Sequence, residues 1–185
     1  MSLRTSKSHP LQIDHIEHRS GGRIGMSLCP GRRDPEDMDD PWSRNLDTDL
    51  LAIRDWGTSL LVTLIEEKEF DLLQIPEIGA KTKALNMDWL HLPIADFSVP
   101  SADFESVWPV HSANLISRIR SGERIVLHCR GGLGRTGLVA AWLLVELGFN
   151  PTEAIKSVRK ARPHTIETSE QEQYVLDKAK ITHRN

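Results

Sequence analysis

The sequence predicts an α/β protein with a central, mostly parallel, twisted sheet that helices flank on both faces. Two observations predict this class. Short apolar segments rich in β-branched residues alternate along the 185 residues with stretches of helical spacing. These apolar segments are nearly continuous, as in strands that are buried on both faces of a parallel sheet.

The elements are expected in the following order. A polar N-terminal arm, partly ordered at best, covers residues 1–22, and a single domain covers residues 23–185. The domain begins with an edge strand at residues 23–28, and further strands are expected at residues 59–65, 88–92 and 123–127. Helices are expected at residues 45–56, 76–85, 101–120, 138–147 and 151–161, with a last helix after a break at residues 162–171.

Capping residues support several of these boundaries. Gly57 and Gly148 follow helical stretches and predict their ends. Ser101 is a suitable N-cap, and Asn150 followed by Pro151 predicts the start of another helix.

Composition limits the function classes. A net charge of −3 argues against a general binder of nucleic acid or of membrane surfaces. The longest uncharged apolar run, residues 137–145, is far short of the ~20 residues that a membrane span needs, and the polar start of the chain lacks a signal-peptide pattern. The only two cysteines are Cys29 and Cys129, and the chemistry below needs one of them reduced. We expect a cytoplasmic monomer.

Residues 128–137, His-Cys-Arg-Gly-Gly-Leu-Gly-Arg-Thr-Gly, carry the strongest functional pattern. They lie between a predicted strand and a predicted helix, so free backbone N–H groups and the positive end of a helix dipole converge there. Gly131, Gly132 and Gly134 allow the backbone to curl around one centre. The stretch therefore predicts an anion-binding loop.

Four side chains of this stretch add chemistry. The N-terminal end of a helix and nearby cations favour the thiolate form of cysteine, so Cys129 is the expected nucleophile. Arg135 offers two parallel donors to a phosphate or a phosphoryl transition state. Thr136 places a hydroxyl next to the sulfur, and His128 orients the loop from behind.

The pattern His-Cys-x5-Arg-Thr-Gly resembles the signature of the cysteine-dependent protein tyrosine and dual-specificity phosphatases. Over residues 24–178 the chain is most similar to their kinase-associated, cyclin-dependent-kinase-inhibitor-like branch. The supporting segments are Arg32-Arg33-Asp34, Pro93-Ile94-Ala95-Asp96, Gly131-Gly132-Leu133-Gly134, and Ile166-Glu167-Thr168 with Gln171. Thr136-Gly137 departs from the eukaryotic member of that branch, so a cyclin-dependent kinase partner is not carried over.

The resemblance implies a protein tyrosine phosphatase-like fold, a cysteinyl-phosphate intermediate, and no metal or other cofactor. It implies that the substrate phosphate is held by a loop formed by Arg130, Gly131, Gly132, Leu133, Gly134 and Arg135.

Asp96 is the expected general acid and base. Dephosphorylation through a thiolate needs an acid for the leaving oxygen and then a base for water. Asp96 lies 33 residues before Cys129 (129 − 96), after one strand and before a crossover helix, so both residues are expected at the carboxyl edge of the sheet. In the resembled family a mobile loop at this place carries the acid. Asp103 is the second candidate.

Gln171 admits two interpretations. In related phosphatases a Gln near this point positions the hydrolytic water, whereas Thr168-x-x-Gln171 is also a capping box. We favour the functional interpretation, with Gln173 as the alternative residue.

The predicted function is hydrolysis of a phosphomonoester, with a phosphorylated protein as substrate and neither nucleic acid nor membrane as partner. The larger phosphotyrosine-specific enzymes of the resembled family form a deep cleft with a loop that carries a tyrosine. The only tyrosine here, Tyr174, lies in the last predicted helix, so the shallow pocket of a dual-specificity enzyme is expected. Arg130 leaves a phosphoinositide phosphatase as an alternative, and a catalytically weak phosphopeptide-binding module is another. Arg32 and Arg33 either border the active site or lie in a solvated turn, and pairing of Cys29 with Cys129 stays open.

Overall fold

The computed structural model describes residues 3–34 and 41–182 and contains a five-stranded sheet of order β1-β2-β7-β5-β6. The strands are β1 (Asp14–Glu17), β2 (Arg23–Ser27), β5 (Thr58–Thr63), β6 (Asp88–His91) and β7 (Arg124–His128). All neighbouring pairs are parallel except β1 with β2. The predicted class, a mostly parallel sheet with helices on both faces, is confirmed.

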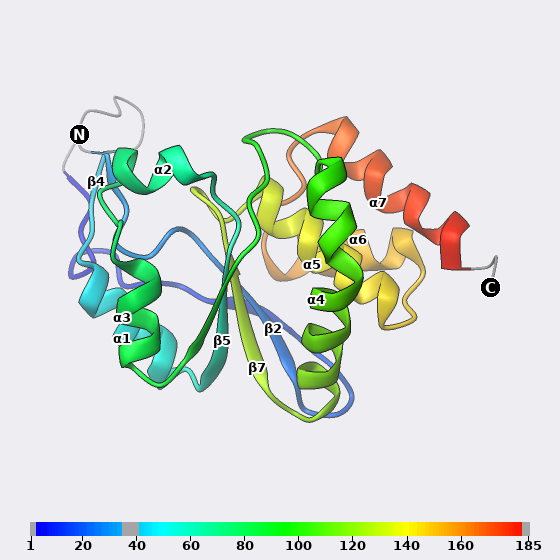
Figure 1. The fold of residues 1–185 in the computed structure, drawn as a ribbon, viewed down its shortest axis with the longest axis horizontal. Coiled ribbons are helices and arrows are strands. Elements are labelled where there is room, and N and C mark those ends of the chain that lie inside the picture. The colour runs from blue at the N-terminus through cyan, green and yellow to red at the C-terminus, as the bar shows by residue number, and fades with distance from the viewer. Residues whose placement is uncertain (1–2, 35–40, 183–185) are drawn as a thin grey trace.

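Helices cover both faces of this sheet (Figure 1). One face is covered by α1 (Leu46–Asp55) and α3 (Ile78–Ala84), and the other by α4 (Ala102–Arg120), α5 (Gly134–Glu146) and α6 (Pro151–Ala161). The last helix, α7 (Ser169–Thr182), packs on α5 and α6.

Three short elements were not predicted. Helix α2 (Glu67–Leu72) follows β5, and β3 (Arg33–Asp34) pairs with β4 (Trp42–Ser43) in a separate ribbon. Such short elements depend on their surroundings more than on sequence pattern, and α2 will prove important for the site.

The N-terminal segment differs from expectation. Residues 14–17 of the predicted arm form β1, which pairs antiparallel with β2, so the expectation of partial order at best is wrong for this part of the chain. β2 therefore lies between β1 and β7, and the prediction that residues 23–28 form an edge strand is also wrong. Side chains of β1 alternate between half-buried and exposed, and this shallow burial explains its polar composition.

The predicted caps agree with the structure. The Asn150 side chain accepts a hydrogen bond from the Thr152 N–H, and Ser101 caps α4 through the Phe104 N–H. Gly57 and Gly148 follow α1 and α5 with φ of 89° and 99°, conformations that favour glycine. Helix α5 begins at Gly134, four residues earlier than predicted, so its first turn is part of the anion-binding loop.

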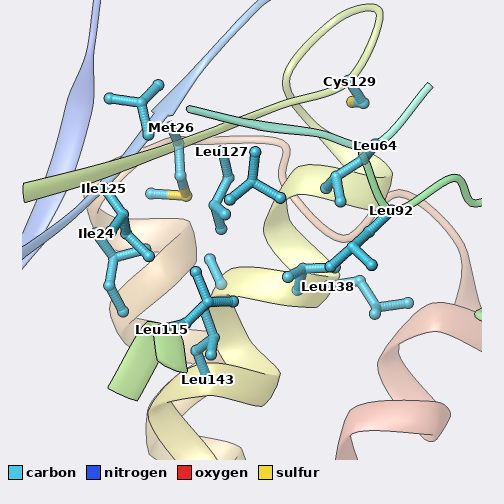
Figure 2. Close-up of a cluster of buried hydrophobic side chains, with 14 of the residues drawn as sticks. Ile24, Met26, Leu64, Leu92, Leu115, Ile125, Leu127, Cys129, Leu138 and Leu143 are labelled. Atoms are coloured by element: carbon cyan, nitrogen blue, oxygen red, sulfur yellow. The ribbon is translucent and has the colours of Figure 1, made fainter. Parts of the chain in front are cut away.

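The main core lies between the sheet and the helices. Ile24, Met26, Ile125 and Leu127 of the strands face Leu115 of α4 and Leu138 and Leu143 of α5, all fully or nearly fully buried (Figure 2). This packing fixes α5 against β7 and therefore fixes the loop that joins them. Within residues 3–34 and 41–182 no helix has the length and apolar character of a membrane span.

Candidate active site

The candidate site lies at the carboxyl ends of the central strands. The strand register places Thr63 of β5 beside His91 of β6 and His128 of β7. Cys129 follows directly, and it lies in the loop from β7 to α5 at the margin of the hydrophobic cluster (Figure 2). This edge of a parallel sheet is where ligands bind in α/β proteins.

Arg135 lies in the first turn of α5 and is 1% exposed. Its Nη1 and Nη2 atoms donate to Oε2 and Oε1 of Glu69 at 2.6 Å and 3.0 Å, and Nη1 also donates to the Ile94 carbonyl at 3.2 Å. The guanidinium is therefore fixed from two sides, by α2 and by the segment that precedes Asp96.

The ion pair shifts both pKa values. Burial alone would raise the pKa of Glu69, but hydrogen bonds from Arg135 and from the Glu66 N–H outweigh it, and the pKa is lowered. Burial alone would lower the pKa of Arg135, but the hydrogen bonds and charge of Glu69 and the charge of Cys129 raise it. Both groups remain charged at neutral pH.

Asp96 pairs with Arg135, whereas the prediction concerned Asp96 and Cys129 at the carboxyl edge of the sheet. Its Oδ1 lies 3.0 Å from Arg135 Nη2, and its side chain is 40% exposed. The same oxygen accepts a hydrogen bond from the Phe97 N–H at 3.1 Å. Asp103, the second candidate acid, is exposed in the first turn of α4, where its carbonyl accepts a hydrogen bond from Ser106.

Two buried polar atoms of the predicted site have no hydrogen-bond partner among the described residues: Arg135 Nε and Thr136 Oγ1. Buried donors usually find partners, and such exceptions are common where a ligand or a reacting group is to be bound. Arg135 Nε can donate to an oxyanion while both terminal nitrogens hold Glu69. Thr136 has its hydroxyl available for the sulfur.

His128 is fully buried behind the loop. Trp89 Nε1 donates to Thr63 Oγ1 at 2.9 Å, and Thr63 Oγ1 lies 2.8 Å from His128 Nε2. The Cys129 carbonyl can only accept, so His128 Nδ1–H donates to it at 3.2 Å, and Nε2 of the neutral ring then accepts from the Thr63 hydroxyl. Burial lowers the pKa of His128 to about 4, so the imidazole is neutral. The predicted orienting role agrees with these contacts.

One N–H group of the predicted phosphate loop is engaged by the chain itself. The Gly134 N–H donates to Glu167 Oε2 at 2.7 Å. Glu167 is exposed and lies in the connection between α6 and α7. It thus places a carboxylate at the N-terminal end of α5, where the helix dipole favours negative charge.

Gln171 is fully buried and uses its carboxamide on backbone groups. Its Oε1 accepts from the N–H groups of Glu167 and Thr168 at 3.0 Å and 3.4 Å, and its Nε2 donates to the Ser98 carbonyl at 3.1 Å. The Thr168 hydroxyl also caps the Gln171 N–H at 3.1 Å. Gln171 therefore joins the Asp96 loop to the Glu167 segment. Its water-positioning role stays a prediction.

Gln173, the alternative to Gln171, has a different place. Its Nε2 donates to Asp177 one turn later in α7, at 3.1 Å in an exposed position. The structure thus brings Gln171, rather than Gln173, to the Asp96 loop.

Arg32 reaches the loop through a shared carboxylate. Arg32 Nε and Arg130 Nη2 donate to Asp34 Oδ2 at 2.7 Å and 3.1 Å. Arg33 instead donates from Nε to the Arg44 carbonyl at 3.2 Å. Arg32, but not Arg33, is thus tied to the predicted phosphate loop.

Cys29 lies close to the same loop. Its N–H donates to the Arg130 carbonyl at 3.0 Å, and burial together with the charge of Cys129 raises its pKa well above the ordinary value. Both cysteines are buried free thiols.

Glu69 and Glu167 are contacts of the site that sequence reasoning missed. The available signal for Glu69 was an acidic residue shortly after a buried strand, at the sheet edge that also holds Cys129. Glu167 was used for the resemblance but was given no role. The sequence around Glu69 and around Glu167 does not predict which residue each carboxylate binds.

Comparisons with known proteins agree with this arrangement. A family model described as "Polymorphic toxin system, DSP-PTPase phosphatase" matches residues 37–148, more than half of the chain. Cyclin-dependent kinase inhibitor 3 of Rattus norvegicus is 29% identical over 135 residues, 71% of this chain and 62% of the relative. Tyrosine-protein phosphatase cdc-14 of Caenorhabditis elegans is 31% identical over 121 residues, 65% of this chain and 15% of the relative. The chain thus spans less than two thirds of these relatives.

Two solved structures share the fold. Kinase associated phosphatase with its catalytic cysteine replaced by serine has a TM-score of 0.81 at 23% identity, covering 95% of this chain and 98% of that one. Tk-PTP in the active form has a TM-score of 0.65 at 29% identity, covering 88% and 94%. Together with the match of the family model, the order of β7, loop and α5 and the meeting of Asp96 with Arg135 show that the chain belongs to the DSP-PTPase family of dual-specificity phosphatases.

Proposed function

We propose that the protein is a phosphoric monoester hydrolase that dephosphorylates phosphoproteins through a cysteinyl-phosphate intermediate on Cys129. The observation that carries the proposal is the contact between Asp96 and Arg135 at 3.0 Å, in the first turn of the helix that follows the Cys129 loop. In this contact the proton donor, Asp96, lies against Arg135, the cation that would bind the phosphate. The motif predicts Cys129 as the nucleophile of the same site.

In the first step the Cys129 thiolate attacks phosphorus in line with the leaving oxygen. The S–P bond forms, the P–O bond breaks, and Asp96 gives its proton to the leaving alkoxide or phenoxide. Arg135 Nε and the N–H groups of residues 130–133 stabilise the equatorial oxygens, whose negative charge is greatest in the transition state. Thr136 donates its hydroxyl hydrogen to the sulfur.

In the second step the Asp96 carboxylate takes a proton from water. The water oxygen bonds to phosphorus and the S–P bond breaks, which releases inorganic phosphate and restores the Cys129 thiolate. The contact of Asp96 with Arg135 supports this assignment, because the carboxylate is held over the guanidinium that binds the phosphoryl group. The steps use no metal.

Phosphotyrosine is the favoured substrate group, with phosphoserine and phosphothreonine also accepted. Phe97 follows Asp96, is 62% exposed, and has a φ of 55°. Bulky residues rarely adopt a positive φ, and those that do cluster at functional sites. The exposed ring of Phe97, next to the proton donor, would pack against the ring of a phosphotyrosine. Because the mechanism requires a reduced thiol, we place the enzyme in the cytoplasm.

The test is hydrolysis of para-nitrophenyl phosphate from pH 5 to 8 with EDTA present, by wild type, Cys129→Ser and Asp96→Asn. We expect metal-independent turnover that is lost in the serine variant and about 10²-fold slower in the asparagine variant. A folded, reduced wild type without activity would instead support the phosphopeptide-binding module.

Substrate class is tested with phosphotyrosine and phosphothreonine peptides and with a phosphoinositide. We expect the highest kcat/KM for the phosphotyrosine peptide. A preference for the phosphoinositide would overturn the proposed substrate and favour the alternative that Arg130 suggested.

A further inference from the structure

Arg162 contacts the back of the predicted phosphate loop. Its Nε donates to the Gly132 carbonyl at 2.7 Å and its Nη2 to the Gly131 carbonyl at 3.2 Å. The Cys29 N–H donates to the carbonyl before these, that of Arg130, at 3.0 Å. Three consecutive carbonyls of the loop are therefore bound from outside the loop.

This contact determines where the N–H groups point. In a trans peptide the carbonyl of one residue and the N–H of the next point in opposite directions, and the described chain contains no cis peptide. Binding the carbonyls of residues 130–132 on one side therefore turns the N–H groups of Gly131, Gly132 and Leu133 toward the other side. The proposed mechanism requires the oxyanion on Cys129 to lie on that side.

We propose that Arg162 is a positioning residue for phosphate binding: it holds the loop carbonyls so that the N–H groups converge on the substrate phosphate. The inference rests on the proposed function and adds to it a residue outside the signature, 33 positions after Cys129 (162 − 129). The planar fork of arginine suits the task, because it binds two neighbouring carbonyls at once and a lysine cannot.

Arg162 is itself fixed in place. It follows α6 with an extended backbone, φ −136° and ψ 100°. Its Nη1 forms an ion pair with Asp14 of β1 at 2.7 Å, and the two side chains are only 13% and 18% exposed. The guanidinium is thus held between the N-terminal strand and the loop.

Gly132, whose carbonyl Arg162 binds, also packs closely against β2. Its φ is 72°, and a Cβ at this position would lie 2.2 Å from the Ser27 carbonyl oxygen. The loop therefore has little room to move toward β2. Within this limited space, the contacts with Arg162 determine the direction in which the peptide groups of the loop point.

The test measures oxyanion binding without turnover, by calorimetric titration of the reduced protein with sodium tungstate. Arg162→Ala is expected to raise the dissociation constant at least about tenfold, and Arg162→Lys and Asp14→Asn less. KM for para-nitrophenyl phosphate should rise in parallel, while the pH profile of kcat keeps its shape. Arg118→Ala is the matched control, because Arg118 also forms ion pairs, with Asp88 and Glu123, but away from the loop.

The results separate the two proposals. Wild-type affinity in folded Arg162→Lys and Asp14→Asn variants, or an equal loss of affinity in Arg118→Ala, would overturn the role of Arg162. If wild type hydrolyses the phosphate ester and binds tungstate, such a result leaves the proposed function standing. Absence of both tungstate binding and turnover in wild type would overturn the proposed function and, with it, the inference.

Discussion

Glu69 binds both terminal nitrogens of Arg135, at 2.6 Å and 3.0 Å, although the two residues are 66 positions apart in the chain. The pair is almost completely buried, with side-chain exposures of 5% and 1%. Glu69 also accepts a hydrogen bond from the Glu66 N–H at 2.8 Å, so its carboxylate is fixed by the start of α2. Glu69 uses one N–H of each terminal nitrogen, and the Ile94 carbonyl accepts from Nη1 as well. Nε and the Nη2 N–H that faces Asp96 therefore remain for the substrate.

We therefore predict that Glu69→Gln lowers both stability and activity. Removing one partner of a buried ion pair costs about 3 kcal/mol, because the other charge stays buried. Asp96 compensates in part, but it then binds Arg135 more firmly and is less available as an acid. Urea unfolding at pH 7 and kcat for para-nitrophenyl phosphate measure the two effects. Glu67→Gln, an exposed neighbour in α2, is the control, and equal behaviour of the two variants would contradict the role of Glu69.

Arg135→Lys is predicted to lower kcat by about 10²–10³-fold. A lysine ammonium cannot bind both oxygens of Glu69 and at the same time donate from an Nε-like position to a phosphate. Turnover and tungstate affinity check this, and Arg118→Lys controls for general effects of the replacement. A lysine variant with nearly wild-type kcat would refute the assigned role of Arg135.

We predict that the protein loses stability in acid because His128 is buried. Burial lowers its pKa from 6.5 to about 4, so below pH 6.5 the unfolded chain takes up a proton that the folded protein resists. Stability is thus lost as pH falls from about 6.5 to about 4, by about 3 kcal/mol in all.

The comparison of wild type with His128→Asn isolates this effect. We expect the difference in unfolding free energy between the two to shrink by about 3 kcal/mol from pH 7 to pH 4, since the variant lacks the titrating group. His164→Asn, at an exposed histidine, should follow wild type. A pH-independent difference between wild type and His128→Asn would show that the buried imidazole does not resist protonation.

Gln171→Ala is predicted to lower stability by about 1–3 kcal/mol, because three backbone groups lose their partner, and to slow turnover by loosening the Asp96 loop. Gln173→Ala, which removes only an exposed contact within α7, should resemble wild type. Urea unfolding and rapid-quench kinetics distinguish the roles. Accumulation of cysteinyl phosphate without loss of stability would favour water positioning by Gln171.

Local patterns in the sequence predicted where Cys129, Arg135 and Asp96 lie in the fold, and their catalytic roles stay predictions. The spacing of Cys129, Arg135 and the glycines follows from one turn between a strand and a helix, and the place of Asp96 follows from the end of β6. Caps such as Asn150 and stops such as Gly57 likewise depend on residues within a few positions. These features could be predicted because their physical causes are close in the chain.

The missed features depend on distant contacts. Glu69 acquires its role only when α2 packs near α5, and Arg162 acquires its role only when the end of α6 meets the loop. The polar strand β1 shows no strong apolar alternation, because its outward side chains are exposed and the inward ones only half-buried. The four residues by which the start of α5 was misplaced are part of the loop, where glycines mask helical periodicity.

The ion pair between Asp14 and Arg162 joins positions that are 148 residues apart. During synthesis, the motif through Thr136 is complete 26 residues before Arg162 is added (162 − 136), roughly 1–5 s earlier at the usual rates of elongation. A nascent chain that already contains every signature residue therefore lacks the guanidinium that orients the loop. Phosphate-binding competence is thus acquired late, once both the first strand and the end of α6 have been made.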